Sequence, residues 1–384
     1  MEIRTDVGTA SLSKEGEEVC GDTIQLIETK ESTTVILSDG LGSGSKASIL
    51  SILSTKIASS LIETKLGVEE VFTTIANTLP ICQWRGIAYS TLSILQINNE
   101  GEAHLIEYDN PSLILVRRGE VVDIEKEDKN IAGKEVKEAN FQLELGDVLI
   151  LVTDGVINAG VGGLFPLGLG KDRLIDKILP IDMKNDDSWE IANKIINLTD
   201  AFYKQKPGDD STAVVLKARE VENLVVFTGP PKDKRLDNKV VDDFINHPAD
   251  KRAVCGGTTA QIVARELDET IDTNLEYFDT SVPPSAEING IDLVTEGILT
   301  LNKSLEKLKQ LSKARTNLNE KDAATRLVKH FLEADKIIFL MGKAVNPAHE
   351  DLMRSMQIRP RNKTVGRIIK KLQEIGKEIE IEVY

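Results

Sequence analysis

The chain has 384 residues, of which 47 are Lys or Arg and 62 are Asp or Glu, so its formal net charge is −15. This acidic balance argues against nucleic acid and against anionic membrane surfaces as main partners. Hydrophobic residues make up 41% and charged residues 28%, as in globular proteins in general, and the length favours two domains.

The cysteines and the N-terminus exclude several further classes. Cys20, Cys82 and Cys255 show no paired spacing, so neither a disulfide framework nor a structural zinc site is expected. The first residues contain no apolar signal core, and nowhere do eighteen apolar residues run together. The sequence therefore predicts a cytoplasmic protein.

A hairpin is predicted near the N-terminus, with strands over residues 23–29 and 32–37. Asp22 stands at the start of the first strand and Asp39 at the end of the second. Because these two ends are neighbours in an antiparallel pair, the two carboxylates are expected to meet at one edge of the sheet. Helices over 45–66, with Ser45 as N-cap, and over 68–79 then form one layer over that sheet.

β-character resumes further along the chain, in strands predicted over 88–97, 104–109, 113–117, 121–124, 141–145 and 148–153. The last two are predicted to pair through a turn at Gly146-Asp147. The run 148–152 is apolar throughout, so we expect it to be buried on both faces and to deliver Asp154 as the earlier strand delivers Asp39. Helices over 173–179 and 189–202 and a strand over 212–216 complete an α+β fold, an antiparallel sandwich flanked by helix pairs.

Acidic residues recur at the ends of these strands. The four motifs are Gly21-Asp22, Ser38-Asp39-Gly40-Leu41-Gly42-Ser43-Gly44, Thr153-Asp154-Gly155 and Gly208-Asp209-Asp210-Ser211-Thr212. A single Asp-Gly is common turn chemistry. Carboxylates without clustered His or Cys, however, are hard oxygen ligands suited to Mg²⁺ or Mn²⁺. Two such ions about 4 Å apart, bridged by one carboxylate, are a standard device for phosphoryl hydrolysis.

Taken together, the motifs resemble those of the metal-dependent Ser/Thr protein phosphatases of the PPM or type 2C superfamily. The Asp-Gly-Leu-Gly-Ser-Gly form resembles the bacterial stage II sporulation protein E branch, and the resemblance covers residues 1–217. It implies the phosphatase fold of that superfamily, two Mn²⁺ or Mg²⁺ ions, and hydrolysis of phosphoserine or phosphothreonine in a protein by a metal-bridging water. In this branch the substrates are often small signalling proteins, such as anti-sigma-factor antagonists.

The resemblance also implies a catalytic and metal-binding set: Asp22, Asp39, Gly40, Asp154 and Asp209. Asp39 would bridge both ions, and the carbonyl of Gly40 would bind one of them. Asp210 stands where the family often has Asn, so it would support the site rather than bind metal. Leu41 replaces a His of animal relatives that is thought to protonate the leaving group, which leaves the general acid open.

Strand and helix alternate after Lys217, which predicts a separate α/β domain. The expected domains are therefore 1–220, the phosphatase, and 221–384, a regulatory or target-binding domain for which no family is recognised. In the second, Gly256-Gly257-Thr258-Thr259 is similar to an anion-binding helix start. It is not a P-loop, and an N-cap after a tight turn explains it equally well.

Two functions of different classes remain open from the sequence. The first is the phosphatase, in which a partner or a homodimer contact would shift the helices beside the Asp39 loop and so switch metal occupancy. The second is a non-catalytic signalling adaptor or ligand sensor that keeps the phosphatase fold and docks a partner around Gly256-Gly257. Metal-dependent turnover of a phosphate ester discriminates between them.

Overall fold

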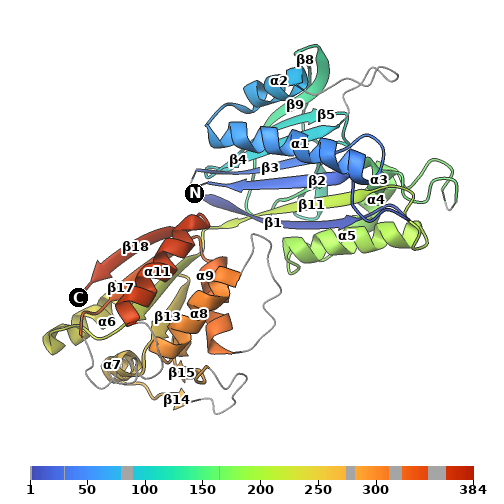
Figure 1. The fold of residues 1–384 in the computed structure, drawn as a ribbon. Helices are drawn as coiled ribbons and strands as arrows, with labels where there is room; N and C mark the ends of the chain where they lie inside the picture. Colours follow the sequence, from blue (N-terminus) through green and yellow to red (C-terminus); the bar gives the residue numbers. More distant parts are fainter. Residues whose placement is uncertain are drawn as a thin grey trace. The chain divides into compact units, whose positions relative to one another are not determined.

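The structure, a computed structural model, describes residues 2–29, 31–78, 90–163, 165–273, 282–310, 322–344 and 360–384. Cys82 and the start of the strand predicted over 88–97 lie outside these ranges. The chain divides into two compact units, Met1–Glu220 and Val221–Tyr384 (Figure 1). In the described ranges, no helix has the length and apolar character needed to span a membrane.

The first unit contains two antiparallel sheets. The five-stranded sheet has the order β1-β11-β10-β6-β7, and the six-stranded sheet has the order β2-β3-β4-β5-β9-β8. The strands of the first are β1 (Ile3–Leu12), β6 (Ile114–Arg117), β7 (Glu120–Val122), β10 (Val148–Val152) and β11 (Ser211–Glu220). Those of the second are β2 (Asp22–Glu28), β3 (Ser32–Asp39), β4 (Leu92–Asn98), β5 (Glu102–Tyr108), β8 (Glu127–Ile131) and β9 (Lys134–Gln142).

The two sheets pack face to face around a common core that includes Leu37, Leu105, Leu149 and Leu216. Helices α1 (Gly44–Glu63) and α2 (Val68–Thr78) cover the outer face of the six-stranded sheet. Helices α4 (Lys171–Ile178) and α5 (Ser188–Phe202) cover the other sheet. This four-layer arrangement is the predicted sandwich with its two helix pairs, and β10 is fully buried, as expected.

Helix α1 turns a different face to the sheet than its apolar stripe suggests. Ile49 and Leu53, whose spacing predicted the helix, are 63% and 44% exposed. The buried positions are mostly small residues: Ala47, Ser48, Ser51, Ser54, Thr55, Ala58, Ser59 and Ile62. Small side chains let the helix lie close to the strands, and the hydroxyl of Ser51 donates to the carbonyl oxygen of Gly21 at 2.6 Å. The prediction of Ser45 as N-cap is wrong, since Ser43 holds that position.

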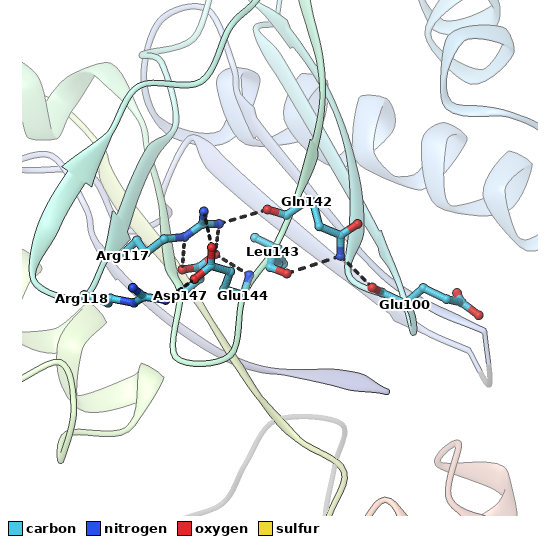
Figure 2. A network of polar contacts seen from close by, with 7 residues as sticks. All are labelled: Glu100, Arg117, Arg118, Gln142, Leu143, Glu144 and Asp147. Atoms are coloured by element: carbon cyan, nitrogen blue, oxygen red, sulfur yellow. Dashed lines mark hydrogen bonds and ion pairs between the residues drawn. The ribbon is translucent and has the colours of Figure 1, made fainter. Parts of the chain in front are cut away.

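The predicted hairpin across Gly146-Asp147 is also wrong. Strand β9 pairs with β5 and β8, whereas β10 pairs with β6 and β11 of the other sheet. Figure 2 shows how the intervening segment is fixed as it crosses between the sheets. Arg117 on β6 donates to both carboxylate oxygens of Asp147, at 2.9 and 2.7 Å, and to the carbonyl of Gln142 at 3.0 Å. Asp147 is buried in this crossover and also accepts from the amide of Glu144.

The second unit is built on one mixed sheet of order β14-β15-β16-β13-β12-β17-β18. Strands β16, β13, β12, β17 and β18 are parallel, so the order of the parallel strands along the chain is 3-2-1-4-5, that of a doubly wound sheet. The described strands are β12 (Asn223–Thr228), β13 (Lys251–Cys255), β14 (Asp272–Thr273), β15 (Ala286–Ile288), β16 (Ile291–Thr295), β17 (Lys336–Met341) and β18 (Glu378–Val383).

Helices cover both faces of this sheet. Helices α6 (Asp237–Asn246) and α7 (Gly257–Leu267) pack on one face, where Phe227 and Phe244 belong to the core. Helices α8 (Ile298–Gln310), α9 (Ala323–Glu333) and α11 (Arg361–Glu374) pack on the other, around Phe331 and Phe339. The alternation of strand and helix therefore produces an α/β unit, although β14, β15 and β16 are not predicted from the sequence.

Candidate metal centre

Asp22 and Asp39 lie opposite each other in the β2–β3 pair, at one edge of the six-stranded sheet. The prediction that antiparallel pairing makes these carboxylates neighbours is therefore confirmed. Gly40, next to Asp39, forms an isolated bridge with Ser90 beside β4. A Cβ on Gly40 would lie 2.0 Å from the carbonyl oxygen of Ala47, so the absence of a side chain lets α1 pack directly on this loop.

A hydrogen bond between the two sheets joins this edge to the other acidic motifs. The hydroxyl of Thr153 donates to Oδ2 of Asp22 at 2.8 Å and accepts from the amide of Thr212 at 2.8 Å. Thr153 directly precedes Asp154, which is the first residue of the short helix α3 (Asp154–Ile157). Thr212 closes the Asp209-Asp210 motif. The four acidic motifs are thus gathered at one edge of the sandwich.

Burial and, to a smaller extent, the charges of the neighbouring carboxylates raise the pKa values of these groups. Burial foremost, and then the charges of Asp22, Asp154 and Asp209, raise the pKa of Asp39 to about 9. Burial raises the pKa of Asp22 to about 6. The pKa values of Asp154 and Asp209 are raised as well, again mainly by burial. Four carboxyl groups therefore share one half-buried site in which like charges oppose ionisation.

Two residues that the sequence analysis left out support Asp39. The amide of Asp39 donates to the hydroxyl of Thr91 at 3.1 Å, and that hydroxyl donates to Oδ1 of Asn110 at 2.6 Å. Asn110 also donates to Ser93, so it holds the end of β4 against the Asp39 strand. Asp109, in a left-handed conformation with φ 54°, raises the pKa of Asp154 by its charge. The sequence signal that could have identified these residues is the position of Asp109 and Asn110 at the end of a strand, because the other acidic motifs share that setting.

Asp210 lies beside the cluster and is almost fully buried. Its Oδ1 accepts from the amide of Lys14 at 3.0 Å, whereas its Oδ2 has no hydrogen-bond partner among the described residues. A Cβ on Gly21 would lie 2.8 Å from that Oδ2, so the missing side chain at Gly21 makes room for the carboxylate. Asp210 therefore packs against Gly21, the residue before Asp22, which fits a residue that supports the metal ligands rather than one that binds metal.

The donor set fits a hard divalent cation. Within the described ranges, Oδ1 of Asp22 and Oδ2 of Asp210 are buried without a hydrogen-bond partner, and a buried unpaired carboxylate oxygen is costly. Among the described residues, no three His, Cys, Asp or Glu side chains converge closely enough to hold a metal ion by themselves. Mg²⁺ does not require that, because it keeps several waters and is usually bound through one or two carboxylates.

The contact between Gly40 and α1 makes a sharp prediction. We expect Gly40→Ala to destabilise the first unit by about 1–3 kcal/mol, because the new methyl group must displace the backbone of Ala47. Weaker Mn²⁺ binding should accompany it, since the Asp39 loop moves with α1. Thermal unfolding and Mn²⁺ titration measure both effects. Gly67→Ala is the matched control, because a Cβ there meets nothing within 4 Å; equal effects of the two variants would contradict the prediction.

Comparison with known proteins finds relatives of the first unit. The family model described as Stage II sporulation protein E (SpoIIE) matches residues 29–219. The chain is 26% identical over 221 residues to the stage II sporulation protein E of Bacillus subtilis strain 168. That match takes in 56% of this chain and 26% of the relative, so this chain corresponds to about a quarter of the relative's length.

One solved structure supports the fold. The PP2C phosphatase domain of Bacillus subtilis SpoIIE, with a fragment of its regulatory domain, has a TM-score of 0.50 at 22% identity, over 57% of this chain and 63% of that one. RsbX, solved in complex with magnesium, has a TM-score of 0.41 at 22% identity, over 56% and 96% of the two chains. Residues 29–219 of this chain therefore match the SpoIIE family, and the first unit has the fold of the PP2C phosphatase domains.

Proposed function

We propose that the first unit is a Mn²⁺- or Mg²⁺-dependent phosphatase that hydrolyses phosphoserine or phosphothreonine in a protein. The observation that carries this proposal is the hydrogen bond from Thr153 to Asp22, because it brings the acidic ends of both sheets to one edge. Two bound ions would lower the pKa of a water molecule and neutralise charge on the phosphoryl oxygens. The match of residues 29–219 to the SpoIIE family, together with the fold of a PP2C phosphatase domain, supports the same reaction.

The proposed roles of the residues are those that the resemblance implies, and the gathering of the acidic motifs at one edge supports them. Asp39, at the centre of the cluster, would bridge two ions, and the carbonyl of Gly40 and the carboxylate of Asp22 would complete one ion's protein ligands. Asp154 and Asp209 would hold the other ion. The Thr153 hydroxyl orients Asp22, and Thr91 holds the backbone of Asp39, so both ligands are positioned before metal binds.

The proposed substrate is a phosphoprotein of bacterial signalling in the cytoplasm, such as an anti-sigma-factor antagonist. The family that the domain matches supports this choice of substrate class. Ionised carboxylates of the cluster repel phosphate, which is also negatively charged, so the ions are needed to make the site attractive to the substrate. A homodimer contact at α1 and α2 remains a proposal for regulation, because α1 begins directly after the Asp39 loop.

Hydrolysis of p-nitrophenyl phosphate and of phosphoserine and phosphothreonine peptides, with Mn²⁺ and with EDTA, tests the reaction on the full chain. We expect Mn²⁺-dependent turnover that EDTA abolishes. If the folded protein binds Mn²⁺ but hydrolyses none of these substrates, the adaptor function replaces the phosphatase. If it binds no Mn²⁺ at all, the assignment of the acidic cluster as a metal centre fails as well.

A further inference from the structure

The carboxyl ends of the parallel strands in the second unit run into glycines. These are Gly229 after β12, Gly256 after β13, Gly297 after β16 and Gly342 after β17. A Cβ on Gly342 would lie 2.0 Å from the carbonyl oxygen of Pro230, and one on Gly297 would lie 3.2 Å from the Cα of Gly256. The loops therefore approach each other backbone to backbone. In doubly wound sheets, ligands bind outside this edge, near the point where the strand order reverses, which here lies between β12 and β17.

Helix α7 begins at this edge without a capping side chain. Its N-cap is Gly256, whose φ of 134° is accessible to glycine but strained for other residues, and no side chain accepts from the first turn. A Cβ on Gly257 would meet nothing within 4 Å, so the space over the first turn is open. Helix α8, which starts at the same edge, is different, because the carboxylate of Glu296 accepts from the amides of Ile298 and Leu299. The first amides of α7 are thus available to an anion.

Arg361, a cation with no carboxylate partner among the described residues, lies at the point where the strand order reverses. Arg361, the first residue of α11, donates to the carbonyl oxygens of Gly342 and Ala344 at 2.7 and 3.1 Å. Burial lowers its pKa, no neighbouring carboxylate raises that pKa, and Arg361 forms no ion pair in the described part of the chain. Arg361 is half-buried, and its acceptors among the described residues, which include Oδ1 of Asn362, are all neutral, so an anionic partner is favoured.

Gly229 connects this guanidinium to α7. Its amide donates to the hydroxyl of Thr259, in the first turn of α7, at 3.0 Å. A Cβ on Gly229 would lie 2.0 Å from Nη1 of Arg361. Gly229 therefore contacts both the first turn of α7 and the guanidinium of Arg361. One small ligand can reach both groups.

Two buried hydroxyls at the same edge lack an oxygen or nitrogen partner among the described residues. They are those of Thr295, which contacts the thiol of Cys255, and of Thr300, and the two residues are only 2% and 0% exposed. Thr295 ends β16 beside the start of α7, and its carbonyl accepts from the amide of Gly256 at 2.9 Å. Thr300 lies in the first turns of α8. Unsatisfied buried polar groups at a strand edge are independent signs of a ligand site.

We propose that the carboxyl edge of this sheet binds the phosphate group of a small molecule, through the first amides of α7 and the guanidinium of Arg361. The ligand is not a dinucleotide of the usual kind, because the segment after β12 lacks the Gly-x-Gly-x-x-Gly pattern. Binding here would make the second unit a sensor of a phosphorylated metabolite. The site lies wholly within the second unit and does not depend on the metal centre.

Calorimetric titration of the full chain in EDTA with inorganic phosphate, pyrophosphate and ADP tests the proposal, since EDTA keeps phosphate from binding through metal ions. We expect at least one of the three to bind, and the strongest binder shows whether phosphate alone or an attached nucleoside is recognised. We expect Gly257→Asp to weaken that binding at least tenfold while the helix folds at least as well, because a carboxylate at a helix start favours the helix but repels the anion. Gly257→Ala is the matched control and should change affinity less than threefold.

A second variant pair addresses the cation. Arg361→Gln should also weaken binding at least tenfold, whereas Arg367→Gln, on an exposed turn of the same helix, should leave it unchanged. If Arg361→Gln fails to fold, the two Gly257 variants still decide the outcome. Absence of binding by all three probes overturns the proposal, and so does binding that Gly257→Asp leaves unchanged.

Discussion

Replacing Asp39 with Asn is expected to lower Mn²⁺-dependent hydrolysis of p-nitrophenyl phosphate on the order of a thousandfold and to raise the melting temperature of the metal-free protein. The loss follows because a bridging carboxylate supports several kcal/mol of transition-state stabilisation by metal ions, and each 1.36 kcal/mol is a factor of about ten in rate. The gain in stability follows because Asp39 is buried among the carboxylates of Asp22, Asp154 and Asp209, and an amide removes that repulsion.

The opposite signs of these two effects make the test specific. A substitution that merely damages the fold lowers both activity and melting temperature. Asp172→Asn, on the exposed surface of α4, removes one negative charge without touching the cluster and should change neither quantity. An Asp39→Asn protein that is both inactive and less stable in EDTA would mean that Asp39 makes a favourable contact in the metal-free protein, contrary to the proposed site.

The meeting of Asp22 and Asp39 could be predicted from the sequence because it depends only on local pairing. Two short strands separated by two residues have few ways to pair, and the antiparallel register then puts their outer ends together. The long apolar run before Asp154 likewise predicts a buried strand, as observed for β10. Local information therefore accounts for each half of the site.

The joining of these halves could not be predicted in the same way. It depends on the chain crossing from one sheet to the other after β9, which Arg117 and Asp147 fix through contacts distant in sequence. Gly146-Asp147 has the chemistry of a hairpin turn, and nothing in the two residues themselves distinguishes a turn from a crossover. The hydrogen bond from Thr153 to Asp22, 131 positions apart, forms only because of that crossing.

The buried face of α1 could not be predicted from the sequence for a related reason. Hydrophobic periodicity identifies a helix, but it identifies the buried face only when burial is driven by large apolar side chains. Here Ser51 and Ser54 face the strands and make hydrogen bonds to Gly21 and Ser90, so close approach replaces apolar area. Ile49 and Leu53, which the hydrophobic pattern alone would place on the buried face, are exposed.

The stability of the metal-free protein is expected to fall as pH rises from about 6 to about 9, and Asp39→Asn is expected to remove most of that fall. The pKa of Asp39 is about 9 in the folded protein, and that of an unfolded Asp is about 3.9. Between these values the folded state holds a proton that the unfolded state has lost, so stability decreases with pH. The slope approaches about 1.4 kcal/mol per pH unit for one proton.

Metal should reverse this dependence, because carboxylates bind Mn²⁺ only when deprotonated and Mn²⁺ binding therefore strengthens as pH rises. Denaturant unfolding of the wild type and of Asp39→Asn at pH 6, 7, 8 and 9, with EDTA and with saturating Mn²⁺, measures all four dependences. A wild type whose stability in EDTA is as flat across this range as that of Asp39→Asn would contradict the prediction. It would mean that Asp39 is ionised already at pH 6, and that the carboxylates at this edge do not crowd one another enough to need a cation between them.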